Sequence, residues 1–250
     1  MIYLDNASTT VIDPNVLEVM MPYFLEKFQN ASSNHQNGLK IKSDIENARA
    51  LCAQLINCDS DEIIFTSGAT ESINFALKGF VEENFDKGNH IITCKTEHKA
   101  VLKTCEYLET KGIEVTYLDV NSEGVISLDD LENAITSDTS LIALMMVNNE
   151  TGVLHDIKKI CEIAHSKDIS VFCDATQSLG KLPVDVRNLE VDMLCMSGHK
   201  LNGPKGAGFL YVRKGISLTP FMHGGSQEKE MRGGTYNTPL IIGLGKACEV

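Results

Sequence analysis

Short apolar runs alternate along the chain with longer segments in which apolar residues recur at every third or fourth position. The short runs are typical of buried strands, and the wider spacing is typical of amphipathic helices. The helical spacing is clearest over residues 38–56. The expected strands span residues 62–66, 90–94, 113–118, 141–147, 169–174, 193–197 and 208–212. The expected helices span residues 38–56, 71–80, 99–111, 128–135, 157–167 and 238–250.

The order of these elements predicts the fold. Strands that alternate with helices form a mostly parallel sheet covered by helices on both faces. The turn between the last two strands, 193–197 and 208–212, is rich in Gly and Pro and has no room for a helix, so we expect this pair to be antiparallel. We therefore predict a three-layer α/β/α fold on a mostly parallel mixed sheet.

The ends of the chain add the domain organisation. Residues 1–13 are expected to be an N-terminal extended segment, because Asp13 followed by Pro14 is a helix start. No repeat or linker divides the rest, so residues 14–250 are expected to form one large domain. The helical pattern that begins at Thr238 reaches Val250 without a Gly or Pro stop signal, which predicts that the chain ends inside a helix.

Composition and charge narrow the classes of function. The chain has 250 residues, of which 43% are hydrophobic and 22% charged, as in globular proteins. Its net charge of −12 argues against nucleic acids and anionic membranes as partners. The longest apolar run, 141–147, is far shorter than the roughly 20 residues that span a bilayer. The N-terminus has no signal-peptide pattern, so we expect a cytoplasmic protein.

Several kinds of site are disfavoured by the sequence. The eight cysteines are scattered without a CxxC pair, so we expect them to be small buried thiols rather than metal ligands or disulfides. The seven histidines are dispersed, which argues against a metal site. Gly203, Gly206 and Gly208 have the reverse of the GxGxxG spacing and lead into a strand, which argues against a nucleotide-binding dehydrogenase.

Candidate chemistry gathers where expected strands end, because ligands of open parallel sheets bind beyond the carboxyl ends of the strands. The small-residue turn 67–71 precedes a helix, and its N–H groups and the helix dipole suit a phosphate, although a plain N-cap turn would read alike. Asp174 follows a strand and can pair with a protonated pyridine nitrogen, or can simply cap a loop.

A lysine completes this set. Lys200 follows the strand 193–197 and stands beside His199 and near Ser197. A lysine in a cleft loses its proton more easily and can form an imine with an aldehyde, whereas an isolated lysine is usually a solvated surface group. Together, the phosphate turn, the acidic strand end and the lysine supply the three contacts that a Schiff-base cofactor needs.

Eight segments also match the motifs of one enzyme family in order. They span residues 3–7, 32–35, 65–72, 96–101, 147–150, 174–178, 197–200 and 223–225. On these segments, and over nearly all of its length, the chain resembles the cysteine desulfurases, a class V aminotransferase-like branch of the fold-type I pyridoxal phosphate enzymes. The resemblance implies a pyridoxal phosphate-binding large domain over residues 14–250, with the family's C-terminal small domain absent.

The resemblance also implies roles for residues that would contact the cofactor ring. Lys200 matches the lysine that bonds covalently to pyridoxal 5'-phosphate and then moves protons, and His98 matches the histidine that stacks on the ring and assists proton transfer. Asp174 matches the partner of the pyridinium nitrogen, and Gln177 matches the donor to the phenolic oxygen. Asn149 matches a residue beside the ring and the bound amino acid.

The remaining matches concern the phosphate. Ala69, Thr70, Ser197 and His199 match the phosphate pocket of the family. Thr235 matches a threonine that reaches the phosphate of the neighbouring subunit, so the resemblance implies a homodimer with shared sites.

The implied function is a cysteine desulfurase that converts L-cysteine to L-alanine. Its persulfide sulfur would serve iron–sulfur cluster assembly or tRNA thiolation through an acceptor or scaffold protein. In the family, the cysteine that forms the persulfide lies in the absent small domain. No cysteine here occupies a matching motif, and Cys248 is expected to be a helix residue rather than the nucleophile. The alternatives are a selenocysteine lyase, another class V enzyme, or a truncated scaffold that cannot turn over.

Overall fold

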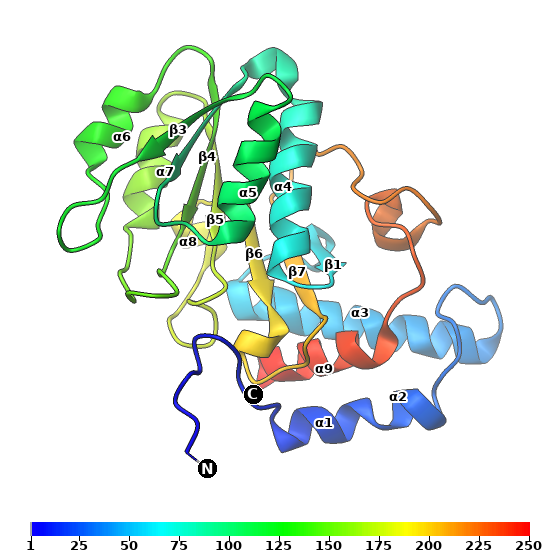
Figure 1. The fold of residues 1–250 in the computed structure, drawn as a ribbon. Coiled ribbons are helices and arrows are strands. Elements are labelled where there is room, and N and C mark those ends of the chain that lie inside the picture. Colours follow the sequence, from blue (N-terminus) through cyan, green and yellow to red (C-terminus); the bar gives the residue numbers. More distant parts are fainter. Residues whose placement is uncertain (1) are drawn as a thin grey trace.

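The computed structural model describes residues 2–250. Over these residues, seven strands form one mixed sheet in the order β1-β7-β6-β5-β4-β2-β3 (Figure 1), in which β7 alone runs against the other strands. The strands are β1 (Ile63–Thr66), β2 (His90–Cys94), β3 (Glu114–Leu118), β4 (Thr139–Met145), β5 (Ser170–Asp174), β6 (Met193–Ser197) and β7 (Gly208–Val212). The α-helices are α1 (Pro14–Met20), α2 (Pro22–Leu25), α3 (Gln36–Ile56), α4 (Ala69–Glu83), α5 (Lys99–Glu109), α6 (Leu128–Ala134), α7 (Ile157–His165), α8 (Val186–Leu189) and α9 (Thr238–Glu249).

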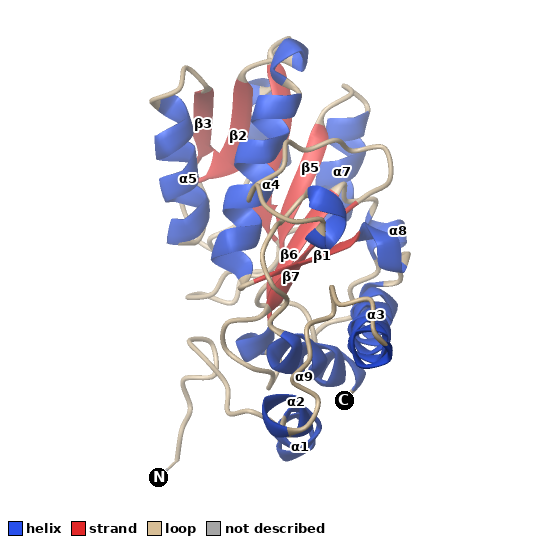
Figure 2. Cartoon of the chain, turned by 90° about the vertical axis from the view of Figure 1, so that its right-hand side faces the viewer, coloured by secondary structure: helices blue, strands red, loops and turns tan. Residues whose placement is uncertain are grey.

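The predicted architecture is confirmed. Helices cover both faces of the sheet: α4 and α5 pack on one face, and α3, α7, α8 and α9 pack on the other (Figure 2). Helix α6 packs on the same face as α7. Successive strand residues alternate between the two cores, as the pleat requires. In β6, for example, Met193 and Cys195 face α4, whereas Leu194 and Met196 face the opposite layer.

Most predicted boundaries agree with the structure within a few residues. The expected helix start at Asp13 is confirmed, because the Asp13 side chain accepts a hydrogen bond from the N–H of Asn15 and so caps α1. The prediction for β4 was shifted. This strand begins at Thr139, which already pairs with His90, and it ends at Met145. The short helices α2 and α8 were not predicted, because four residues are too few to show a helical period.

The first residues of the chain run back toward the end of the sheet that carries the candidate chemistry (Figure 1). Residues 2–13 form no helix or strand, while Met1, also part of the expected extended segment, lies outside the described residues. The Thr10 N–H and the Thr10 hydroxyl both donate to the His199 carbonyl, each over 2.9 Å. Asn202 N–H in turn donates to Thr10 Oγ1 over 2.9 Å, so the extended segment is fixed beside Lys200.

The expectation of buried thiols is confirmed for six of the eight cysteines, while Cys58 and Cys248 are half-buried. Burial raises the pKa of the Cys105 and Cys161 thiols to about 12, so both remain protonated and unreactive at neutral pH. In the described part of the chain, every helix is too short or too polar to cross a membrane.

Helices α3 and α9 cross at close range. A Cβ atom added at Gly245 of α9 would lie 2.7 Å from both Cα and Cβ of Ala48 in α3. We therefore expect Gly245→Ala to lower the free energy of unfolding by about 1–3 kcal/mol, because the two backbones must move apart. Urea unfolding measures the loss. Gly224→Ala is the control, since its added Cβ would stay 3.4 Å from the nearest atom. Equal stability of both variants would contradict the packing argument.

Candidate active site

A cavity of about 820 Å³ opens where β1, β4, β5 and β6 end. This is a usual size for a cofactor site and the expected position for one in an open α/β sheet. The structure brings nine of the ten predicted site residues to its wall. They are Ala69, Thr70, His98, Asn149, Asp174, Gln177, Ser197, His199 and Lys200.

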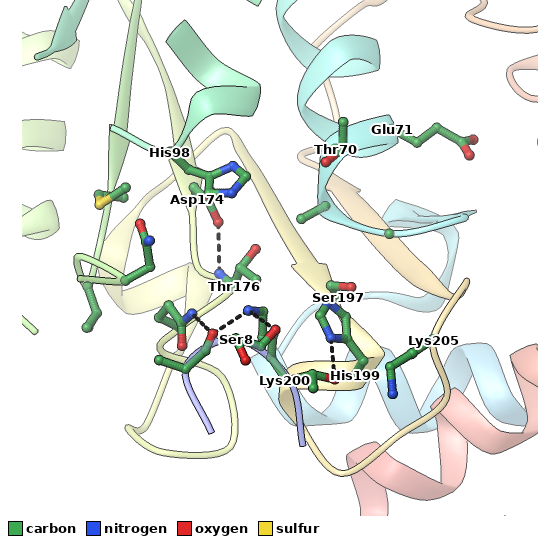
Figure 3. Close-up of a pocket in the computed structure, with 18 of the residues that line it drawn as sticks. Ser8, Thr70, Glu71, His98, Asp174, Thr176, Ser197, His199, Lys200 and Lys205 are labelled. Atoms are coloured by element: carbon green, nitrogen blue, oxygen red, sulfur yellow. Dashed lines mark hydrogen bonds between the residues drawn. The ribbon is translucent and has the colours of Figure 1, made fainter. Parts of the chain in front are cut away.

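The turn between β1 and α4 forms one side of this cavity (Figure 3). Gly68 has a φ of +143°, a conformation that favours glycine. The neighbouring strand comes so close that a Cβ at Gly208 would lie 2.7 Å from the Gly68 Cα. No described side chain caps α4, so the first N–H groups of the helix, including those of Ala69 and Thr70, are available to a ligand. These donors and the helix dipole favour an anion.

An ion pair secures the same turn from the side. Glu71 accepts a hydrogen bond from the Ser67 N–H at 2.9 Å and pairs with Arg232, whose Nε lies 2.8 Å from Glu71 Oε1. Burial alone would raise the pKa of Glu71, but the hydrogen bonds from Arg232 and Ser67 outweigh burial and hold this pKa below its usual range. Arg232 therefore neutralises a carboxylate that would otherwise repel an anion at the turn.

Asp174 is the last residue of β5 and is only 6% exposed. Its Oδ1 accepts a hydrogen bond from the Thr176 N–H at 2.9 Å and a longer one from the Cys195 thiol at 3.5 Å. Oδ2 makes no hydrogen bond to residues 2–250 and is the oxygen left for a ligand. A buried carboxylate with one oxygen held and one available suits a positively charged N–H group.

Lys200 ends the short 3₁₀ turn Gly198–Lys200 that follows β6. Its Nζ donates to the carbonyl oxygens of Ala7 and Ser8, the latter over 2.8 Å. Gln177 Nε2 also donates to the Ala7 carbonyl, over 2.8 Å. Burial, reinforced by the positive charge of Lys181, holds the pKa of Lys200 below its ordinary value. The amine is thus easier to deprotonate than a surface lysine and more nucleophilic at neutral pH.

Two histidines flank the lysine and the carboxylate. Burial, together with the charges of Lys200 and Lys205, lowers the pKa of His199, whose Nδ1 lies 3.0 Å from Thr9 Oγ1. His98 caps α5, because its Nδ1 accepts the N–H of Ala100 at 3.1 Å. The neutral His98 ring therefore carries its proton on Nε2.

Comparison with known proteins shows the family to which the chain belongs. Residues 2–250 match the family described as aminotransferase class-V. The chain belongs to the class V aminotransferase family. The chain also superimposes on a solved NifS-like protein with a TM-score of 0.97, at 42% identity over 99% of this chain and 68% of that one.

Other known proteins are similar to this chain over its full length. The chain is 49% identical to proteins named cysteine desulfurase IscS from Methanosarcina thermophila and from Rickettsia massiliae strain Mtu5, and each alignment covers all of this chain and 62% of the relative. A solved structure described as SspA in complex with cysteine gives a TM-score of 0.96, at 44% identity over 100% of this chain and 72% of that one. The chain thus spans about three-fifths of the length of these curated relatives.

Thr235 lies outside the main cavity of its own chain and lines a smaller one of about 260 Å³ that shares Ser67 and Gly206 with it. This position agrees with a residue assigned to the phosphate of a neighbouring subunit, and that assignment stays a prediction. The N-terminal segment 5–9 does contribute, through Asp5, Ala7, Ser8 and Thr9, although no role was assigned to it. The motif at residues 3–7 could have indicated this contribution, because it is one of the eight segments that match the family. It was not assigned a role, because none of its side chains matches a catalytic residue.

The positive charge of Lys181 leads to a prediction about the pKa of Lys200. Replacing Lys181 with Gln removes a positive charge that disfavours protonation of Lys200, so we expect the pKa of Lys200 to rise. Acetylation of Lys200 by acetic anhydride, followed against pH by peptide mass spectrometry, measures this pKa. Lys167→Gln changes an exposed lysine elsewhere and serves as the control. A Lys200 midpoint that stays fixed, or moves to lower pH, in Lys181→Gln would refute the electrostatic argument.

Proposed function

We propose that this chain is the cofactor-binding part of a pyridoxal phosphate-dependent cysteine desulfurase, which converts L-cysteine to L-alanine and protein-bound sulfur. The observation that carries the proposal is one cavity that combines Lys200, the uncapped N-terminus of α4 and the buried carboxylate of Asp174. The names of the relatives, and the description of one solved relative as a complex with cysteine, support the choice of substrate.

The residues at one end of the cavity fit the phosphate group of the cofactor. The N–H groups of Ala69 and Thr70 and the side chains of Ser197 and His199 supply donors around one end of the cavity. A Cβ atom added at Gly68 would lie 3.2 Å from Ser197 Oγ, so the glycine keeps space free between the turn and this donor. These four donors would hold the phosphate.

The residues in the rest of the cavity fit the pyridine ring of the cofactor. Asp174, through Oδ2, would hold the ring N–H, and Gln177 Nε2 would donate to the phenolic oxygen. His98 would stack on the ring, and Asn149 would lie beside the ring and the amino acid. All four residues line the cavity, and they come from the ends of three strands or the segments that follow them: β5 for Asp174 and Gln177, β2 for His98, and β4 for Asn149.

When bound, pyridoxal phosphate supplies an electron sink for the electrons released at the amino acid Cα. Lys200 Nζ would take the Cα proton and later return one, a task that suits an amine with a lowered pKa. His98, with its proton on Nε2, would assist that transfer. Residues 5–9 and the wall around Asp174 would exclude water from the reacting atoms.

The proposal extends to partners and location. We propose a homodimer in which Thr235 of each copy reaches the phosphate held by the other. The sulfur would pass to an acceptor or scaffold protein for iron–sulfur cluster assembly or tRNA thiolation. We place the enzyme in the cytoplasm, where free thiols such as those of its eight cysteines stay reduced.

Proton exchange in heavy water tests the proposal. With pyridoxal phosphate, L-cysteine and dithiothreitol as an external sulfur acceptor, we expect deuterium at the Cα of L-cysteine and in newly formed L-alanine, both followed by proton NMR. D-cysteine is the control, since one fixed lysine serves one face of the substrate. A chain that binds the cofactor but exchanges no Cα proton would overturn the desulfurase proposal in favour of a scaffold.

A further inference from the structure

Glu97 is a buried carboxyl group behind the cavity wall. It directly precedes His98, is only 5% exposed, and its Oε1 accepts the backbone N–H of Met145 over 2.7 Å. Met145 is the last residue of β4, 48 residues further along the chain. Two long-separated segments, both of which contribute to the cavity wall, are therefore joined through one Glu97 oxygen.

The second oxygen of Glu97 is unpaired. Oε2 is fully buried, has no hydrogen-bond partner among residues 2–250, and Glu97 takes part in no ion pair within that range. A buried carboxylate without a cation costs several kcal/mol, so a carboxyl group in this position takes up a proton instead. The surroundings of Oε2 therefore select the neutral acid.

The charged neighbours lead to the same conclusion. The described groups whose charges interact with Glu97 are Asp174 and Cys173 from β5, Cys105 from α5 and Cys94 from β2, and none of these four can carry a positive charge. Burial chiefly, and the negative charge of Asp174 in addition, raise the pKa of Glu97 well above its usual range, while the hydrogen bond from Met145 opposes them. Burial and the charge of Asp174 together outweigh that hydrogen bond.

This carboxyl group connects the predicted ring-binding side chains. Glu97 fixes the N-terminal end of α5, where His98 stands, to Met145. The next residue, Met146, donates its N–H to the Asp174 carbonyl over 3.0 Å. A continuous path of short hydrogen bonds and covalent bonds thus runs from His98 to Asp174, across β4.

We propose that Glu97 is a positioning residue: a neutral carboxylic acid that holds His98 in place against the ends of β4 and β5. Its neutrality keeps a second buried carboxylate from forming near Asp174, whose own charge is then the one offered to a ring N–H. The inference rests on the proposed function for its purpose, but the state of Glu97 and its bond to Met145 can be measured without any cofactor.

Three variants separate the possible roles. Glu97→Gln replaces a neutral acid by a neutral amide of the same shape, whose carbonyl can still accept the Met145 N–H. Glu97→Ala removes that acceptor. Glu106→Gln changes an exposed carboxylate on α5, the helix that follows Glu97, where it pairs with Lys103, and is the matched control.

Infrared and exchange measurements on the cofactor-free protein decide the proposal. At pH 7 we expect a protonated-carboxyl stretch that is lost in Glu97→Gln and kept in Glu106→Gln. We expect the Met145 amide to exchange about tenfold faster in Glu97→Ala than in wild type and at an unchanged rate in Glu97→Gln. Absence of the stretch in wild type, or its survival in Glu97→Gln, would overturn the neutral acid. If Glu97→Ala does not fold, the infrared comparison of the two Gln variants still decides.

Cofactor binding then tests the positioning role separately. If wild type binds pyridoxal phosphate, we expect Glu97→Gln to match its Kd within about twofold and Glu97→Ala to bind about tenfold more weakly. Equal binding by all three proteins would refute the positioning role. Failure of wild type to bind would contradict the proposed function instead, and the infrared and exchange results would stand by themselves.

Discussion

Lys200→Ala is expected to lower the rate of Cα proton exchange in L-cysteine by a factor of about 10³ or more, because it removes the amine that would move the proton. Pyridoxal phosphate should also separate from this variant on gel filtration, since no covalent link holds it. Both losses are expected in a protein that still folds, because Lys200 is half-buried and its Nζ bonds only to backbone carbonyls of the N-terminal segment.

Two further variants sharpen this test. Lys200→Arg keeps the positive charge and the long side chain, but its guanidinium cannot give up a proton at neutral pH, so it should be as inactive as Lys200→Ala. Lys167→Ala, at an exposed position outside the cavity, should leave exchange unchanged. Retention of wild-type exchange by Lys200→Arg would contradict the assigned role.

Glu228→Ala is expected to lower the free energy of unfolding by about 3–5 kcal/mol, the usual effect of removing one partner of a buried ion pair. Arg49 and Glu228 are each 6% exposed, and their side chains meet through two hydrogen bonds of 2.7 and 2.8 Å. Glu228 also accepts the Phe65 N–H over 2.7 Å. Its removal leaves a buried backbone donor unpaired and takes from Arg49 its buried carboxylate partner, so that the guanidinium keeps only the exposed Glu46 carboxylate and the Ile63 carbonyl among residues 2–250. Denaturant unfolding measures the cost.

The same residue begins a strained turn, which adds to its expected effect. Glu228, Lys229 and Glu230 have φ angles of +47°, +57° and +70°, a region that non-glycine residues rarely occupy. The turn leads to Arg232 and Thr235, so loss of the anchor should also loosen the loop beside the phosphate turn. Surrounding contacts hold such a turn in place, and the buried Arg49 pair is one of them.

Exposed and apolar replacements serve as controls for Glu228. Lys214→Ala breaks an exposed contact with Asp59 and should lower the stability far less than Glu228→Ala, because solvent screens exposed charges. The double change of Arg49→Met with Glu228→Leu removes both buried charges and should be far less harmful than Glu228→Ala. A loss below about 1 kcal/mol in Glu228→Ala would show that the pair does not stabilise the fold.

The sheet and the strand-end residues could be predicted because both follow from local patterns. Periodicity marks strands and helices, and parallel strands bring their carboxyl ends to one edge, so Asp174 and Lys200 were expected to meet. The turn 67–71 joined them for the same reason, since it follows β1 at that edge.

The remaining features depend on contacts between distant residues that no local pattern reveals. Thr10 bonds to His199, 189 residues away, and thereby brings the irregular N-terminal segment to Lys200. Arg49 and Glu228 are 179 residues apart and look in the sequence like two ordinary surface charges. The bond between Glu97 and Met145 is hidden in the same way, because only the folded chain shows that the carboxyl group is buried.

The most direct test of the account is to locate pyridoxal phosphate on the chain after borohydride reduction. We predict a visible absorbance band on mixing, which reduction removes, and a single pyridoxyl group that peptide mass mapping finds on Lys200. The contradicting result is either no band, or a label spread over exposed lysines with none on Lys200.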